Sequence, residues 1–266
     1  MINDFYMEQK VFLKISRDKY VRFQNAELFH KRIDFVSKFL GTINGRVLDV
    51  GNLGDGDGFM NARPIVEAAG GEYFGLDVNE NLAKKMGATN QFIGDLHDLR
   101  GVVDSNSFDA IYAGEVIEHS WQPGKIILEC SRILKDGGML LMDTPNVYDL
   151  RSVVQVLFQR KNTLGDVQEL TLEETKDNYQ SYRNEQYQIE SQPQHKIFYS
   201  PASMRQLLNM HGFKLEKIVY IDKASNPIHK LFVYFFPSSA QKIGVVARKC
   251  SSVEKIFSEH QFGDLS

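Results

Sequence analysis

The sequence predicts an α/β fold with a doubly wound, mostly parallel sheet of seven strands. Short apolar runs alternate with amphipathic segments, glycines close several of these segments, and an acidic residue lies at or near the end of each of the first three runs. This alternation is typical of parallel βαβ units with helices on both faces of the sheet. The strands are expected at residues 46–50, 72–78, 91–95, 108–113, 139–144, 214–221 and 242–249.

Helices are expected between these runs. The segment from Ser200 to 213 is the clearest, because Ser200 can cap the helix, Pro201 suits its first turn and Gly212 can end it. A helix packed on the core is expected over residues 24–40, within an N-terminal helical extension over residues 1–40. The other helices are predicted at residues 60–70, 80–87 and 124–138.

A polar stretch interrupts the alternation. Residues 147–194 are rich in Gln, Asn, Glu and Tyr and carry no strand signal, so we expect an inserted, mainly helical lid that binds the acceptor. The chain of 266 residues is otherwise expected to be one domain. The apolar run LFVYFF, residues 231–236, is either a core strand or a docking loop, and it is too short to span a bilayer.

Composition excludes several classes of protein. The net charge is −3 and no basic stripe is present, which argues against a nucleic-acid partner. The two cysteines, Cys130 and Cys250, have neither disulfide-framework nor zinc-site spacing. No signal peptide or transmembrane run is recognisable, so a cytoplasmic location is expected.

A glycine-rich stretch follows the first predicted strand. VLDVGNLGDGDG, residues 47–58, lacks the lysine of a phosphate-binding loop, and its three aspartates would repel phosphate. Asp77 and Asp95 end the next two runs, where carboxylates could meet the ribose hydroxyls and the exocyclic amine of a nucleoside. Acidic residues with bare glycines suit a nucleoside whose far end carries positive charge, such as S-adenosylmethionine.

Four further stretches make the pattern more specific: FGLDVNENL, FIGDLHDL, FDAIYAGEVIEH and ILECSRILKDGGMLLMDTPN. With the glycine stretch, they resemble the motifs of class I S-adenosylmethionine-dependent methyltransferases, which have a Rossmann-like fold. The first motif differs from the family's usual pattern because extra residues separate Gly51 from the later glycines. The resemblance implies that the cofactor is bound by Asp49, Gly51, Asn52, Gly54, Asp77, Val78, Asp95, Leu96 and Glu115.

EVIEH, residues 115–119, supplies candidates for the chemistry. If a helical turn begins at Glu115, then Glu115, Glu118 and His119 share one face. The string resembles ubiquinone-biosynthesis O-methyltransferases, in which these positions are implicated in binding a divalent cation, here Mg²⁺ or Zn²⁺. Alternatively, His119 is a metal-free general base, or Glu118 and His119 only cap a helix. His195 is a second candidate base, or a surface histidine.

The predicted function is methyl transfer from S-adenosylmethionine to the oxygen of a small hydroxylated acceptor, such as a sugar or a polysaccharide precursor. Two alternatives stay open: a quinone or lipid-ring O-methyltransferase acting near a membrane, and a domain that binds the cofactor without catalysis. The acceptor's identity and the choice between oxygen and nitrogen are not fixed by the sequence, which also leaves open a homodimer.

Overall fold

A computed structural model describes residues 27–53, 61–154, 197–223 and 226–250. Predictions for residues 1–26, for Gly54, for His195 and for most of the 147–194 insertion lie outside the described residues. The strands are β1 (Leu28–Phe29), β2 (Arg46–Val50), β3 (Glu72–Asp77), β4 (Gln91–Ile93), β5 (Phe108–Gly114), β6 (Leu134–Pro145), β7 (Phe213–Ile221) and β8 (Lys242–Lys249).

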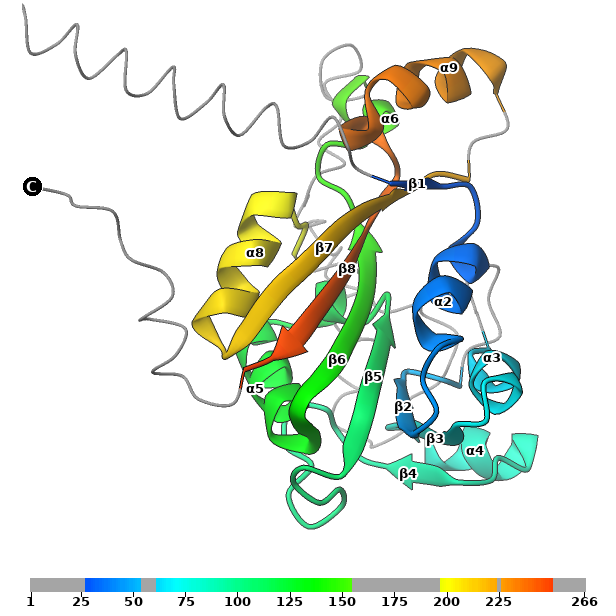
Figure 1. The fold of residues 1–266 in the computed structure, drawn as a ribbon, viewed down its shortest axis with the longest axis vertical. Helices are drawn as coiled ribbons and strands as arrows, with labels where there is room; N and C mark the ends of the chain where they lie inside the picture. The colour runs from blue at the N-terminus through cyan, green and yellow to red at the C-terminus, as the bar shows by residue number, and fades with distance from the viewer. Residues whose placement is uncertain (1–26, 54–60, 155–196, 224–225, 251–266) are drawn as a thin grey trace, which may run out of the picture.

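Helices connect these strands and flank the sheet (Figure 1). Several have clear boundary signals: the Asn79 side chain accepts a hydrogen bond from Leu82 N at the start of α4, and Gly87 ends α4 in the left-handed conformation. Ser200 and Ser203 form a capping box at the start of α8. The helices are α2 (Arg32–Leu40), α3 (Arg63–Ala68), α4 (Glu80–Met86), α5 (Pro123–Ile133), α6 (Leu150–Val154), α8 (Pro201–Met210) and α9 (Pro227–Phe235), with short 3-10 turns η1 (Ile117–His119) and η3 (Pro237–Ser239).

The sheet has the order β1-β7-β8-β6-β5-β2-β3-β4. Strand β8 pairs antiparallel with β6 and β7, and the other neighbouring strands pair parallel. From the central strand β2 the chain first runs outward through β3 and β4, and then crosses back to β5 on the other side. The carboxyl ends of β2 and β5 therefore form the switch point at which ligands bind in such sheets.

The predicted α/β fold is confirmed, with one strand more than expected. The additional strand is β1, which falls in the segment predicted as a helix over residues 24–40; only α2 is helical there. Leu28 and Phe29 lie beside Tyr220 and Ile221 of β7, and backbone hydrogen bonds flank this pairing. Pairing with a strand far along the chain overrides the local helical pattern.

Two further boundaries were wrong. The helix predicted over residues 124–138 ends at Ile133, because Leu134 already pairs with Phe108 as the start of β6. The run 231–236 is neither a strand nor a loop, since it lies in α9 and the residue after it. Asn226 caps this helix, its side chain accepting a hydrogen bond from Ile228 N.

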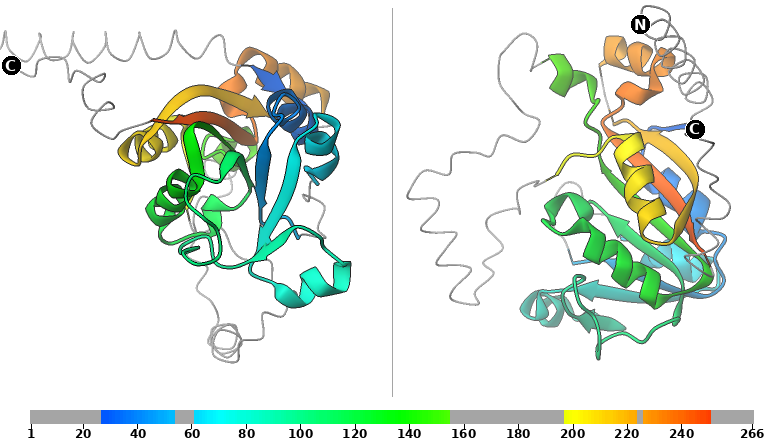
Figure 2. Two further views of the ribbon diagram at one scale, coloured as in Figure 1. Left: turned by 60° about the horizontal axis from the view of Figure 1, so that its bottom comes forward. Right: turned by 90° about the vertical axis from the view of Figure 1, so that its left-hand side faces the viewer.

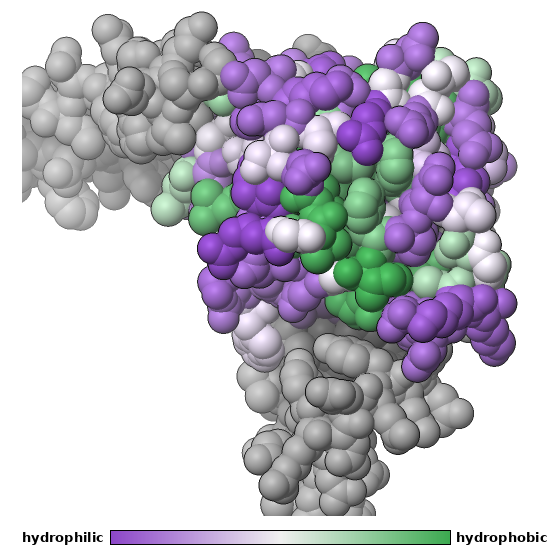
Figure 3. Space-filling view, turned by 90° about the horizontal axis from the view of Figure 1, so that it is seen from below, coloured by the Kyte–Doolittle hydropathy of each residue, from purple (hydrophilic) through white to green (hydrophobic). Residues whose placement is uncertain are grey.

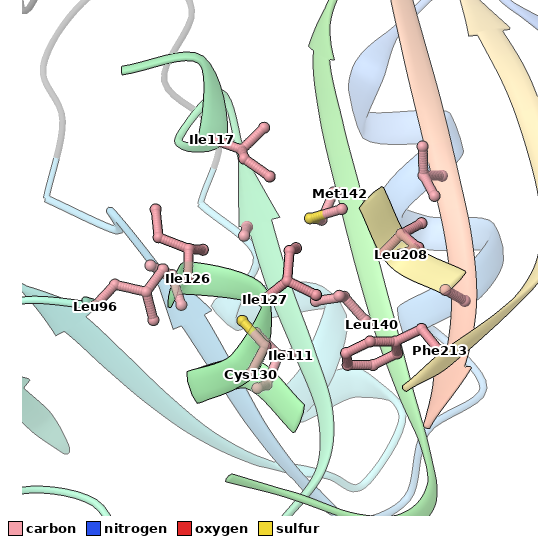
Figure 4. Close-up of a cluster of buried hydrophobic side chains, with 14 of the residues drawn as sticks. Leu96, Ile111, Ile117, Ile126, Ile127, Cys130, Leu140, Met142, Leu208 and Phe213 are labelled. Atoms are coloured by element: carbon pink, nitrogen blue, oxygen red, sulfur yellow. The ribbon is translucent and has the colours of Figure 1, made fainter. Parts of the chain in front are cut away.

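Apolar side chains fill both faces of the sheet. Helices α5 and α8 cover one face, and α2 and α3 cover the other (Figures 1 and 2). On the first face, Ile127 of α5 and Leu208 of α8 lie toward Ile111 and Leu140 of the central strands (Figure 4). Each fully buried side chain of this size stabilises the fold by about 1.5–3 kcal/mol.

The two ends of the sheet differ in what they present. Figure 3 views the molecule from the end at which β5 and β6 begin, where apolar residues gather in the middle of the surface and hydrophilic residues frame them. The acidic residues singled out in the sequence follow the opposite ends of their strands: Asp77 closes β3, and Asp95 follows β4. The candidate site is therefore at that opposite edge.

Candidate functional site

The turn after β2 brings bare backbone to the carboxyl edge of the sheet. Gly51 has a φ of +68°, a conformation that strains residues with a side chain. Its N–H donates to the Leu76 carbonyl at 2.8 Å, which ties the turn to β3. A Cβ added here would lie 3.0 Å from Val116 Cγ2. Glycine therefore suits this turn because it adopts a positive φ without strain and because it has no Cβ to crowd Val116.

Asp77 is held in place at the tip of β3. Its Oδ1 accepts a hydrogen bond from Asn79 N at 2.9 Å, and its Oδ2 accepts one from Leu53 N at 3.3 Å. Burial raises the pKa of Asp77, and the backbone N–H groups around it oppose this effect only in part. The carboxylate thus stands beside the Gly51 turn, while the neighbouring Val78 side chain is exposed.

Asn52 connects the β2 turn to β4. Its side-chain amide forms a reciprocal pair with Gln91: Asn52 Nδ2 donates to Gln91 Oε1 at 2.8 Å, and Gln91 Nε2 donates to Asn52 Oδ1 at 2.9 Å. The sequence predicted Asn52 as a cofactor contact. In the structure its amide ties the turn after β2 to the start of β4, which leaves its backbone as the part able to meet a ligand.

Asp95 and Leu96 follow β4 and differ in exposure. The Asp95 carboxylate is mostly exposed, and its Oδ1 contacts both the backbone N and the ring Nδ1 of His97. Burial raises the pKa of Asp95, but the hydrogen bonds from His97 outweigh this and hold that pKa below its ordinary value. Leu96 is buried in the core cluster on the α5 side of the sheet (Figure 4).

Asp49 lies apart from this edge. Its carboxylate is buried and accepts a hydrogen bond from the Tyr73 hydroxyl at 2.9 Å. Burial raises the pKa of Asp49 to about 7, although the Tyr73 hydrogen bond lowers it. Asp77 and Asp95 therefore stand at adjacent strand ends, whereas the Asp49 carboxylate is buried within the sheet region and paired with Tyr73.

The predicted single face of Glu115, Glu118 and His119 does not form. Glu115 has a φ of +56°, so the chain leaves β5 in a left-handed step rather than a helical turn. Its carboxylate pairs with Lys242 at 2.5 Å and lies 3.8 Å from Arg32. Only residues 117–119 form a short 3-10 turn, in which His119 is half-buried.

This geometry does not bring the three predicted metal ligands together. Glu118 is turned inward, away from solvent, and its Oε2 accepts a hydrogen bond from the Thr144 hydroxyl at 3.0 Å, whereas Glu115 is engaged with Lys242. Over the ranges that the structure describes, no three His, Cys, Asp or Glu residues are grouped so that they could hold a metal ion. The spacing of Glu115, Glu118 and His119 places their side chains on one face only if these residues form an α-helix, and they do not.

Glu118 belongs instead to a small buried cluster with Thr144 and Tyr199, here named the Glu118 cluster. Ile197 N donates to the Glu118 carbonyl at 3.1 Å, and Tyr199 bridges to Asn146 beyond β6. Glu118 Oε1 and the Tyr199 hydroxyl are buried and have no hydrogen-bond partner among the described residues. Burial raises the pKa of Glu118 to about 8, and the pKa of Tyr199 is also raised, by burial and by the charge of Glu118.

Sequence reasoning missed Tyr199. A tyrosine in an apolar run is typical of a core residue, and its backbone does pair like one. Its distinctive property is a buried hydroxyl without a partner, which depends on the surrounding structure and not on the residue type. Buried polar groups of this kind are uncommon in folded proteins, and each calls for an explanation.

Comparisons with known proteins match the part of the chain that contains this edge of the sheet. A family profile described as "Methyltransferase domain" matches residues 48–142, from β2 to β6. The resemblance to S-adenosylmethionine-dependent methyltransferases that the sequence predicts is confirmed over these residues. The matched range contains Gly51, Asp77, Asp95 and Glu118.

Curated relatives match the same part of this methyltransferase domain. A ubiquinone biosynthesis O-methyltransferase of Xanthomonas oryzae is 31% identical over 122 residues, which is 43% of this chain and 49% of the relative. A "probable S-adenosylmethionine-dependent methyltransferase" of Mycobacterium tuberculosis is 29% identical over 100 residues, or 32% of this chain and 36% of the relative. Each match thus spans less than half of the relative's own length.

Solved structures share the fold of the methyltransferase domain at low sequence identity. A chain from the Haloferax volcanii complex of the Trm112 methyltransferase activator with a methyltransferase has a TM-score of 0.53 at 15% identity, covering 89% of this chain and 94% of that chain. A [4+2]-cyclase has a TM-score of 0.51 at 16% identity, covering 82% and 80%. The fold alone therefore does not identify the reaction.

No helix in the part of the chain that the structure describes is long and apolar enough to cross a membrane.

Proposed function

We propose that this chain binds S-adenosylmethionine at the carboxyl edge of β2, β3 and β4 and transfers its methyl group to a hydroxyl oxygen of a small acceptor. The observation that carries the proposal is the conjunction at the switch point of the left-handed Gly51 turn with Asp77 and Asp95 at the next two strand ends.

The residues present fit the cofactor. A side chain at Gly51 would crowd Val116, so the bare turn leaves room for the methionine portion. Asp77 can accept hydrogen bonds from the ribose hydroxyls, and Asp95 can accept one from the adenine amine. Gly54, Val78, Leu96 and Glu115 remain proposed cofactor contacts. When bound, S-adenosylmethionine supplies an electrophilic methyl group on a sulfonium sulfur.

The acceptor side is proposed to use η1 and the Glu118 cluster. His119 would take the proton from the acceptor hydroxyl through a ring nitrogen. Glu118 Oε1 and the Tyr199 hydroxyl, which lack partners among the described residues, would hydrogen-bond to further hydroxyls of the acceptor. Several polar groups in one place favour a hydroxylated acceptor such as a sugar. His195, beyond the described residues, stays a proposed second base.

Calorimetric titration with S-adenosylhomocysteine tests the cofactor proposal. The wild-type chain should bind, and Asp77→Ala should weaken binding by about 10- to 100-fold, because charge-assisted hydrogen bonds to the ribose are lost. Asp109→Asn is the matched control, since Asp109 lies near the opposite end of the sheet and pairs with Lys135. Absence of binding by the wild type would refute the proposal, as would unchanged binding by Asp77→Ala.

A second acceptor class, a quinone or another lipid ring, is favoured by two observations. Relatives over this range include ubiquinone biosynthesis O-methyltransferases. In addition, α9 and the residue after it expose large apolar side chains, with Ile228 80% and Tyr234 71% exposed. Residues 223–241 contain Lys223 and Lys230 but no acidic residue. Exposed aromatic and aliphatic side chains beside lysines suit the surface of an anionic lipid bilayer.

Vesicle sedimentation separates the two acceptor classes. If the lipid-ring proposal is right, the chain should sediment with phosphatidylglycerol vesicles more than with phosphatidylcholine vesicles. Leu231→Ser with Phe235→Ser should abolish this, whereas Met210→Ser, an exposed apolar residue of α8, should not. No sedimentation with either vesicle would favour the sugar-type acceptor. Binding of S-adenosylhomocysteine without transfer of labelled methyl to any component of a metabolite extract would support the non-catalytic alternative.

A further inference from the structure

His97 joins two loops on either side of the proposed adenine position. Its ring Nδ1 lies 2.6 Å from Asp95 Oδ1, and its ring Nε2 lies 2.7 Å from the Ser120 hydroxyl. Asp95 follows β4, while Ser120 directly follows His119 and closes η1. A single side chain thus connects the adenine side of the site to the loop that carries the proposed base.

The hydrogen bonds along this chain are mutually consistent. Gln122 N donates to Ser120 Oγ at 2.9 Å, so the Ser120 hydroxyl hydrogen is available to His97 Nε2. With Nε2 as acceptor, a neutral imidazole carries its proton on Nδ1, which then donates to Asp95. Ser120 is buried and His97 is half-buried, so water competes little with these contacts.

The two carboxylate oxygens of Asp95 differ in their contacts with described residues. Both hydrogen bonds that the carboxylate accepts from described residues, from His97 N and from His97 Nδ1, reach Oδ1. The carboxylate is therefore fixed in orientation, with Oδ2 left for a ligand at an exposed position. Preorganising a polar group in this way reduces the entropy lost when a ligand binds.

We infer that His97 is a positioning residue for adenine recognition: it anchors Asp95 through Oδ1 so that Oδ2 accepts the exocyclic amine, and it couples this anchor to the loop bearing His119 through Ser120. The inference rests on the proposed function, because it needs the adenosine of the cofactor at Asp95. Its consequence is selectivity between an amine and a carbonyl at the same ring position, which a role in folding alone would not produce.

The test compares S-adenosylhomocysteine with S-inosylhomocysteine, which presents a carbonyl where adenine has its amine. Calorimetry on the wild type should favour the adenine compound by about 10- to 100-fold, because a carbonyl facing a carboxylate repels it. His97→Leu should lower this ratio at least about five-fold. His97→Asn should retain most of the ratio, since its amide nitrogen replaces Nδ1 as donor, and Ser120→Ala should give an intermediate ratio.

Arg100→Leu is the matched control. Arg100 lies in the same loop and is exposed, and its guanidinium pairs with Asp98 rather than Asp95; its removal should leave the ratio unchanged. Thermal unfolding of each variant checks that the fold is retained. A ratio in His97→Leu within two-fold of the wild type would overturn the inference while leaving the proposed function intact. A wild-type chain that binds neither compound would instead overturn the proposed function.

Discussion

Two buried polar clusters lie on opposite faces of the same strand and differ in how completely they are paired. Asp143 and Thr144 are consecutive in β6, so their side chains point to opposite faces of the sheet. On the α2 face, the Tyr112 hydroxyl donates to Asp143 at 2.8 Å and accepts from Arg32 at 2.8 Å, while Arg32 Nε lies 3.0 Å from Asp143 Oδ1. We name this set the Arg32 cluster. On the other face, the Glu118 cluster leaves two polar atoms without partners among the described residues.

From this difference we infer a stabilising role for the Arg32 cluster, and it supports the acceptor-binding role proposed for the Glu118 cluster. In the Arg32 cluster a cation, a phenol and a carboxylate contact one another and fasten α2 to the sheet; Asp143 Oδ1 has no hydrogen bond from a described residue, but it lies 3.0 Å from Arg32 Nε. In the Glu118 cluster, the one side-chain hydrogen bond that the buried carboxyl accepts from a described residue comes from the Thr144 hydroxyl, and no cation pairs with Glu118 among the described residues. Burying polar groups without partners costs stability, and a catalytic role or a bound molecule that supplies the partner is among the explanations for such groups in native proteins.

Removal of Arg32 should have the largest effect on stability. In Arg32→Met, Asp143 and Tyr112 lose their cation within a buried site, so we expect the free energy of unfolding to fall by about 3–5 kcal/mol in urea titrations. Arg248→Met is the control, because its partner Glu216 is exposed and such pairs contribute about 0–1 kcal/mol. Equal losses in the two variants would show that the Arg32 cluster is not the anchor of α2.

Glu118→Gln should change how stability depends on pH. Because burial raises the pKa of Glu118 to about 8, the folded chain holds a proton there that the unfolded chain releases near pH 4.5. The wild type therefore loses stability as pH rises from about 4.5 through 8, and Gln removes this loss.

The variant should match the wild type near pH 4 and exceed it by about 3 kcal/mol at pH 7, which lies about 2.5 pH units above the pKa of the unfolded chain, since each unit corresponds to about 1.4 kcal/mol. Urea unfolding at several pH values measures this difference. Glu216→Gln, at an exposed glutamate, should show no such trend. Parallel pH profiles for the wild type and Glu118→Gln would mean that Glu118 is ionised in the folded chain.

Elements that local sequence determines could be predicted, whereas elements that depend on pairing with distant residues could not. Strands β2 and β8 have the bounds expected from their apolar runs, because buried strands leave a compact local signal. Strand β1 could not be predicted, since its two residues become a strand only through pairing with β7, about 190 positions along the chain. The start signal of α9, Asn226 and Pro227, was present in the sequence but was outweighed by the apolar run after it.

The candidate site was predictable to a similar degree. Gly51, Asp77 and Asp95 were placed at strand ends by their position after apolar runs, and the structure has them there. The common face of EVIEH was wrong because a positive φ at Glu115 cannot be read from residue spacing. The Glu118 cluster was beyond reach for another reason: an unpaired hydroxyl is a property of the surroundings, which a motif does not encode.

A pair of tyrosine substitutions, one in each cluster, should give the smallest effects and the sharpest contrast. Both hydroxyls are buried, but of the two only that of Tyr112 is hydrogen-bonded to a described residue, so Tyr112→Phe should lower the free energy of unfolding by about 1–3 kcal/mol, whereas Tyr199→Phe should leave it unchanged or raise it. The two variants delete the same oxygen atom, so any difference arises from the partners. A loss of 1 kcal/mol or more in Tyr199→Phe would show that its hydroxyl is already satisfied within the protein and is not reserved for an acceptor.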